Sequence, residues 1–101
     1  MQELTSSQRK YLRKLAHPLK PVVLVGKNGL TEMVIDSAYH ALEAHELIKV
    51  KFGDFQEQKQ EFSEEIALKT GSLLVGLVGN IAIFYREQAE RKERKIMLPN
   101  P

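Results

Sequence analysis

The chain has 101 residues, enough for one compact domain, and its 43% apolar and 28% charged residues are ordinary for a globular protein. It contains no cysteine, which excludes disulfides and thiolate metal sites and suggests a reducing compartment. It lacks the run of about 18 to 20 apolar residues that a membrane span requires, and residues 1–5 lack a signal-peptide pattern, so we expect a cytoplasmic protein.

The net charge of +2 hides an uneven distribution of charge. Residues 1–29 carry six Lys or Arg and one acid, residues 30–71 carry nine acids and four bases, and residues 72–101 carry five bases and three acids. Such a chain can present a basic face although its total charge is near zero. Uneven charge also arises by chance, so it favours a nucleic-acid partner only slightly.

A first helix is predicted from an N-cap at Ser6 or Ser7 to about Ala16. Its apolar stripe leaves four basic residues on the opposite side at about 100° per residue, namely Arg9, Lys10, Arg13 and Lys14. Pro18 ends this helix because the residue before a proline is pushed out of the helical region. The apolar run 22–25 then predicts a buried strand.

A second helix is predicted from Thr31, its N-cap, to about Ala44. Residues 47–52 alternate in part and predict a second strand. A third helix is expected over about residues 58–70, with Gly71 just past its end. The apolar runs 73–78 and 81–85 then flank Gly79-Asn80, which fits a two-residue hairpin turn.

The predicted order is αβαβαββ, which indicates an α/β (α+β) fold. We expect a single domain over residues 1–87, with a four-stranded mixed sheet and three packed helices. Residues 88–95 are almost wholly charged and residues 98–101 cannot extend a helix, so we expect residues 88–101 to form a mobile charged tail or a frayed helix.

The tetrad Gly26-Lys27-Asn28-Gly29 joins a predicted strand directly to a predicted helix. Its glycines allow a sharp turn, and N–H groups at the start of a helix favour a phosphate. Lys27 adds a positive charge and Asn28 a hydrogen-bonding group. A GXXG loop clamps a nucleic-acid backbone in KH domains, although glycines at this spacing also mark ordinary turns. Leu30-Thr31 after Gly29 fits neither a Walker A loop nor a Rossmann loop.

Two longer motifs make the interpretation more specific. Residues 25–32 (VGKNGLTE) and residues 74–86 (LVGLVGNIAIFYR) resemble the two signatures of the CRM domain, the chloroplast RNA splicing and ribosome maturation domain. Residues 45–50 also fit, and the opening of the chain is similar to that of the stand-alone bacterial YhbY-like members. The resemblance covers about residues 4–86, and Gly76 departs from it because relatives usually carry a polar residue there.

The resemblance implies a fold like the C-terminal domain of bacterial translation initiation factor three, preceded by an extra helix. It also implies RNA binding, and an association of the stand-alone members with precursors of the large ribosomal subunit. It assigns RNA contacts to the GXXG loop and the basic helix, beside which we place Thr31 and Arg86. The residues expected to contact RNA are Arg9, Lys10, Arg13, Lys14, Gly26, Lys27, Asn28, Gly29, Thr31 and Arg86.

The sequence therefore predicts a monomeric RNA-binding protein that contacts the ribosomal RNA backbone and assists large-subunit assembly. We expect no enzymatic activity, cofactor, metal, membrane partner or small-molecule substrate, because no catalytic or metal-binding motif is visible. Two alternatives remain: a magnesium-dependent nuclease, and a protein-interaction module whose acidic middle third docks a basic ribosomal protein. The acids of that module would be Glu43, Glu46, Glu61, Glu64 and Glu65.

Overall fold

The computed structural model describes residues 3–90 and 94–99. Its helices and strands are α1 (Ser6–Ala16), β1 (Val23–Val25), α2 (Glu32–His45), β2 (Leu47–Phe52), the 3-10 turn η1 (Gln56–Gln58), α3 (Lys59–Thr70), β3 (Leu73–Val78) and β4 (Ile81–Tyr85). The predicted order αβαβαββ is confirmed, and η1 is an addition to it. Across residues 3–90 and 94–99, no helix has the length and apolar character needed to cross a membrane.

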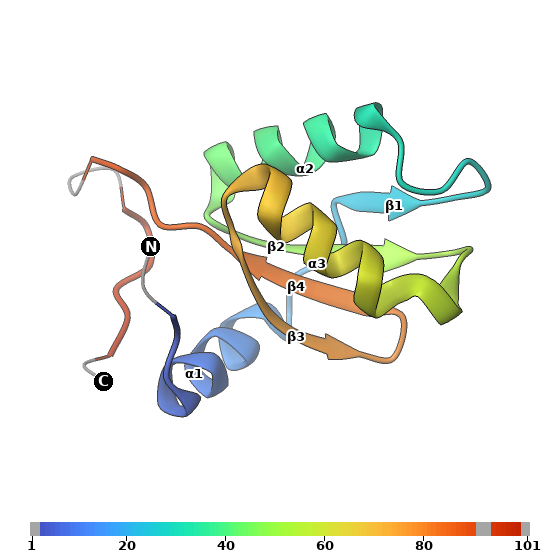
Figure 1. Cartoon of the computed structure of the whole chain (residues 1–101). Coiled ribbons are helices and arrows are strands. Elements are labelled where there is room, and N and C mark those ends of the chain that lie inside the picture. The colour runs from blue at the N-terminus through green and yellow to red at the C-terminus, as the bar shows by residue number, and fades with distance from the viewer. Residues whose placement is uncertain (1–2, 91–93, 100–101) are drawn as a thin grey trace.

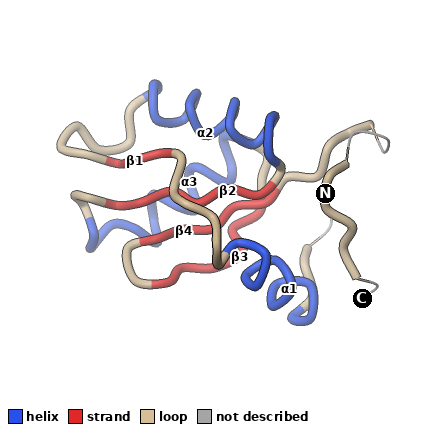
Figure 2. Tube along the Cα trace, turned by 180° about the vertical axis from the view of Figure 1, so that it is seen from behind, coloured by secondary structure: helices blue, strands red, loops and turns tan. Residues whose placement is uncertain are grey.

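The four strands form one mixed sheet in the order β1-β2-β4-β3. β1 is parallel to β2, whereas β4 lies antiparallel between β2 and β3. α2 and α3 cover one face of this sheet, and α1 lies on the opposite face (Figures 1 and 2). The loop after β1, the connection after β2 and the β3–β4 hairpin meet at one end of the sheet (Figure 1).

Side chains of the two central strands, β2 and β4, alternate between two separate cores. Ile48, Val50 and Phe52 of β2 pack with α2 and α3 in the larger core. Leu47 and Tyr85 face the other way and pack with α1 in the smaller core. The predicted single domain with three helices packed on a mixed sheet is confirmed.

The N-cap of α1 is Thr5, so the prediction of Ser6 or Ser7 is wrong. The Thr5 hydroxyl accepts the Gln8 N–H at 3.2 Å, and the Gln8 side chain accepts the Thr5 N–H at 3.0 Å. This reciprocal pair is a capping box, which satisfies two backbone donors at once. The overlooked signal was the spacing of three residues between Thr5 and Gln8.

Three other helix and hairpin ends follow the prediction. Thr31 caps α2 by accepting the Val34 N–H at 3.2 Å. Gly71 ends α3 with a φ of 68°, and Gly79 begins the hairpin turn with a φ of 58°. β1 departs from the prediction of a wholly buried strand, because Leu24 is 58% exposed on the face that α1 covers only in part.

Residues 94–99 are not the free tail that was expected. Ile96 and Leu98 pack against the smaller core, and Pro99 accepts a hydrogen bond from the Gln8 side chain. Glu46, named above as one of the acids of a docking module, is fully buried. Its carboxylate accepts the backbone N–H groups of Gln88, Lys95 and Ile96. The expectation of a mobile tail is therefore wrong for these residues, and residues 91–93 and 100–101 lie outside the described part.

Candidate nucleic-acid interface

The GXXG loop, residues 26–29, leaves β1 in a tight turn. The Gly29 N–H donates to the Gly26 carbonyl at 3.0 Å, and Gly29 has a φ of 72°. This left-handed conformation favours glycine. A Cβ atom on Gly29 would also lie 3.4 Å from the ring of Phe55, whereas one on Gly26 would meet nothing within 4 Å. The turn therefore requires glycine at Gly29 more than at Gly26.

Lys27 and Asn28 form the exposed tip of this loop. Behind them, the Thr31 N–H donates to the Gly29 carbonyl and the Thr31 hydroxyl caps α2. The N–H and the hydroxyl of Thr31, which were expected to be available to a phosphate, are therefore hydrogen-bonded within the protein. The tip still presents a cation and an amide next to the positive end of the α2 dipole.

Arg9 binds the protein's own backbone. Its Nη1 donates to the carbonyl oxygens of Leu74 and Val75, at 2.9 and 3.2 Å. β3 has a register shift between Leu74 and Gly76, which leaves these carbonyls within reach of α1. Arg9 therefore attaches α1 to β3, a role that helical spacing could not reveal.

The other three basic residues of α1 are exposed, namely Lys10, Arg13 and Lys14. The Arg13 side chain passes over Gly76, where an added Cβ atom would lie 3.6 Å from Arg13 Cδ. The absence of a side chain at Gly76 leaves room for Arg13 across β3.

On the face of the sheet that α1 packs against, α1 leaves the end nearest the GXXG loop uncovered. Strand register places Leu24, Lys51, Ile81 and Val78 in one row across all four strands. Leu24 and Val78 are 58% and 60% exposed, and Lys51 is exposed as well. Because β1 continues directly from Leu24 into the GXXG loop, this row ends beside that loop.

A hollow of about 220 Å³ connects this open row to α1. Its lining residues are Arg13, His17, Lys49, Val78, Ile81 and Ile83. The Lys49 Nζ donates to the carbonyls of His17 and Leu19 at 3.2 and 3.0 Å, which places its charge at the end of α1. Lys49 and Lys51 were missed as candidates, although the alternation of lysine with apolar residues in β2 was a signal for them.

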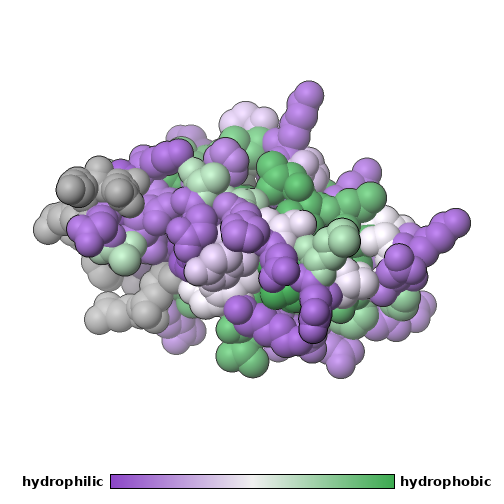
Figure 3. Space-filling view, turned by 90° about the horizontal axis from the view of Figure 1, so that it is seen from above, coloured by the Kyte–Doolittle hydropathy of each residue, from purple (hydrophilic) through white to green (hydrophobic). Residues whose placement is uncertain are grey.

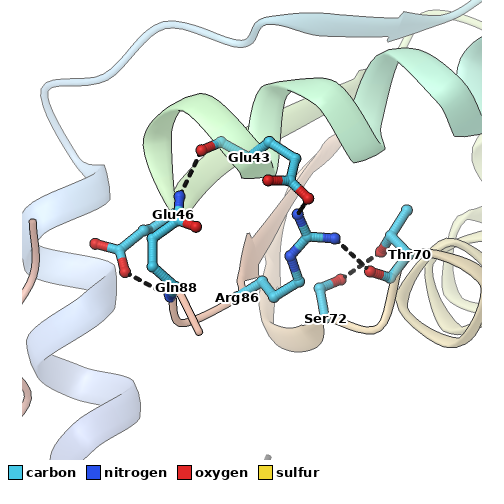
Figure 4. A network of polar contacts seen from close by, with 6 residues as sticks. All are labelled: Glu43, Glu46, Thr70, Ser72, Arg86 and Gln88. Atoms are coloured by element: carbon cyan, nitrogen blue, oxygen red, sulfur yellow. Dashed lines mark hydrogen bonds and ion pairs between the residues drawn. The ribbon is translucent and has the colours of Figure 1, made fainter. Parts of the chain in front are cut away.

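Arg86 lies on the other side of the sheet and is engaged there (Figure 4). Its guanidinium is 2.8 Å from the Glu43 carboxylate and donates to the Thr70 carbonyl at 2.8 Å. It also lies 4.6 Å from the centre of the Tyr39 ring, and its side chain is only 15% exposed. Arg86 is therefore engaged within the protein, on the side of the sheet opposite to α1.

Comparisons with known proteins identify a domain family and similar bacterial proteins. The family model of the CRS1/YhbY (CRM) domain matches residues 4–86. An RNA-binding protein of Haemophilus influenzae is 43% identical over 100 residues, with 98% of each chain covered. The Probable RNA-binding protein YqeI of Bacillus subtilis is 38% identical over 91 residues, which cover 89% of this chain and 95% of that one.

A solved structure shares the fold as well. The solution structure of a hypothetical Staphylococcus aureus protein, for which RNA binding has been suggested, matches with a TM-score of 0.78 and 39% identity. The match covers 96% of this chain and 100% of that one. These relatives are named for RNA binding and not for an enzymatic activity.

Proposed function

Because this chain belongs to the CRS1/YhbY (CRM) domain family, we propose that it binds RNA by the sugar-phosphate backbone. The observation that carries this proposal is a set of basic side chains on the α1 side of the sheet: Arg13 and Lys49 line one hollow, and Lys51 follows Lys49 on the same face of β2. Lys51 pairs in register with Leu24 of β1, the strand that leads into the GXXG loop and its exposed Lys27. Lys10 and Lys14 extend this set along the outer side of α1.

Contacts to the RNA backbone contribute to affinity but do not distinguish one sequence from another. Lysine and arginine at phosphates release bound counterions, so binding is similar for many sequences and weakens as salt rises. The open row of Leu24, Lys51, Ile81 and Val78 contains no aromatic ring on which a base could stack. We therefore assign this row to backbone contact.

The RNA that we propose is ribosomal RNA in a precursor of the large subunit, whose assembly the protein assists. The support is the resemblance of residues 25–32 and 74–86 to the two motifs of a family whose stand-alone bacterial members are associated with such precursors. A domain of 101 residues with one modest basic face buries little RNA. Tight binding would then need a folded RNA surface that contacts the loop and α1 together.

The acidic docking module is not supported by the placement of its residues. Glu46 is buried, Glu43 pairs with Arg86, and Glu65 pairs with Lys69 at 3.3 Å. Over α2, apolar residues are scattered among hydrophilic ones (Figure 3). A metal-dependent nuclease finds no support either, because the described residues contain no cluster of three or more His, Cys, Asp or Glu that could hold a metal ion.

The double substitution Lys27→Asp and Asn28→Asp tests the loop. We expect RNA affinity to fall by about tenfold or more, since hydrogen bonds to charged groups are worth about 1.5–3 kcal/mol. The melting temperature should barely change, because exposed substitutions shift stability by no more than about 0.5 kcal/mol. Fluorescence anisotropy with a labelled structured RNA measures the affinity.

A matched control makes the same change of charge away from the loop, with Gln60→Asp on α3 and Lys95→Asp beside the C-terminal end of α2. It should bind nearly as well as the unaltered protein. Equal losses in the two folded variants would mean that net charge, and not the loop, governs binding.

Sedimentation tests the proposed RNA. In a sucrose gradient of cell extract at low salt, the protein should migrate with large-subunit precursors and leave them as salt rises. An even distribution across translating ribosomes would contradict a role in assembly, and so would its presence only at the top of the gradient.

A further inference from the structure

Phe55 stands beside the GXXG loop in an unusual conformation. Its φ of 56° and ψ of 38° lie in the left-handed region, which bulky side chains rarely adopt. Residues held in such conformations gather at ligand sites. Phe55 is also 40% exposed, although aromatic rings contribute most to stability when buried. Neither property is explained by the fold alone.

The Phe55 ring is held in place by two neighbours. Its edge lies 3.4 Å from the position that a Cβ atom on Gly29 would occupy, so the absence of that atom lets the ring approach the loop. The ring of Phe62 from α3 lies 5.7 Å away, centre to centre, with the two planes tilted by 44°. The protein thus positions an aromatic ring against the GXXG loop and leaves part of it facing solvent.

The exposed part of Phe55 opens onto a hollow of about 570 Å³. The hollow is shallow and wide open to solvent. The hollow is lined by Lys27, Asp54, Phe55, Gln56, Glu57 and Gln58. It therefore combines one aromatic ring and one cation with amides and carboxylates, unlike the open row of the sheet.

We propose that this hollow receives one base of single-stranded RNA, stacked on Phe55, from a nucleotide whose phosphate contacts Lys27. This subsite rests on the proposed function and adds base contact to it. Base stacking on an aromatic ring accepts every base, because each base has a π face. The Asp54 and Glu57 carboxylates repel phosphate, so the phosphate is directed to the Lys27 side and the base to the Phe55 side.

The same carboxylates give the subsite a preference. Aspartate and glutamate accept hydrogen bonds from exocyclic amino groups, such as that of cytosine. Uracil has a similar ring but carries no amino group. The subsite should therefore favour cytosine over uracil.

Two substitutions at Phe55 separate stacking from packing. Phe55→Leu keeps an apolar side chain against Gly29 and Phe62 but removes the π face, whereas Phe55→Tyr keeps the π face. The probes are an oligocytidylate of about eight nucleotides and an abasic strand of equal length, which carries the same phosphates. The unaltered protein and Phe55→Tyr should bind the oligocytidylate at least about fivefold more tightly than the abasic strand. Phe55→Leu should lose most of that advantage, and its retention would overturn the proposal.

Phe55→Trp provides a direct optical readout. The chain contains no tryptophan, so the fluorescence of this variant reports on a single site. We expect the oligocytidylate to quench it and the abasic strand to leave it nearly unchanged. Fluorescence that stays constant while the variant binds oligocytidylate would place the base elsewhere and overturn the proposal.

The preference for cytosine over uracil is tested with two oligonucleotides. The unaltered protein should bind oligocytidylate more tightly than oligouridylate, and Asp54→Asn with Glu57→Gln should reduce the difference. Equal affinities in the unaltered protein would remove the carboxylates from base recognition.

The failure of this subsite can be distinguished from failure of the proposed function. If Phe55→Leu binds all strands normally while Lys27→Asp with Asn28→Asp weakens them, only the base subsite is wrong. If the loop variant binds the abasic strand as well as the unaltered protein does, backbone contact at the loop is wrong too. Absence of binding to either strand by the unaltered protein would overturn both.

Discussion

Tyr85 ends β4 with its side chain fully buried and its hydroxyl without a hydrogen-bond partner among the described residues. Burial raises the pKa of this hydroxyl from 10.0 to about 12, and the Glu87 and Glu46 carboxylates add to the rise. The structure places the Tyr85 side chain in the smaller core. Its neighbour Arg86 was expected to face RNA, and only the folded chain shows it between Glu43 and Thr70.

Tyr85→Phe should stabilise the protein by about 1 kcal/mol at pH 8, since it removes a buried polar group that lacks a partner. The raised pKa means that the neutral hydroxyl is favoured in the folded state. Ionisation of Tyr85 therefore leaves the free energy of unfolding unchanged below pH 10 and lowers it as pH rises from 10 through about 12. The advantage of the Phe variant should therefore grow by about 1.4 kcal/mol between about pH 8 and pH 11, measured by urea unfolding. A less stable Phe variant would show that the hydroxyl has a partner.

Arg9 and Arg13 belong to the same arc of α1 but should respond differently to replacement by Gln. Arg9→Gln should cost about 1–2 kcal/mol of stability, because the charged hydrogen bonds to β3 are lost. Arg13→Gln should change stability by no more than about 0.5 kcal/mol and weaken RNA binding. Thermal unfolding and anisotropy measure both effects, and a stable Arg9→Gln variant with weak RNA binding would reverse the assignment.

At the level of elements, periodicity predicted the helices and strands because each buries one regular face. It could not predict which side of the sheet each helix covers, since an apolar stripe shows that a helix packs on a sheet but not on which face. Nor could it predict the position of residues 94–99. That segment is held by the carboxylate of Glu46, a residue far away in sequence with a φ of 63°. No local pattern encodes a contact of this kind.

Glu46→Gln should loosen residues 94–99 from the domain. The variant keeps one carbonyl oxygen but loses the charge, so we expect a loss of about 1–2 kcal/mol in stability. The Lys95 and Ile96 amides should exchange their hydrogens faster, as measured by NMR. Glu65→Gln, at an exposed site on α3, is the control and should leave both amides unchanged. Unchanged protection in Glu46→Gln would mean that apolar packing alone holds the segment.

At the level of the whole molecule, the order of elements and the two family motifs were sufficient to predict the fold. They were also sufficient to nominate the GXXG loop and the basic helix as candidates. Alternation along β2 indicated that Lys49 and Lys51 share one face, but it could not show what lies beside them, and nothing in the sequence indicated Phe55. The lysines become neighbours of α1 and the loop only through strand register, and Phe55 reaches Gly29 only through a left-handed turn between β2 and α3.

The salt dependence of RNA binding tests backbone contact by this surface most directly. If Arg13 and Lys27 each contact a phosphate, the logarithm of affinity should fall linearly with the logarithm of salt concentration between about 50 and 200 mM. The double variant Arg13→Gln and Lys27→Gln should flatten that slope by about 0.7 per lost contact on single-stranded RNA. An affinity that does not depend on salt, or an identical slope in the folded double variant, would contradict the assignment of this surface to the RNA backbone.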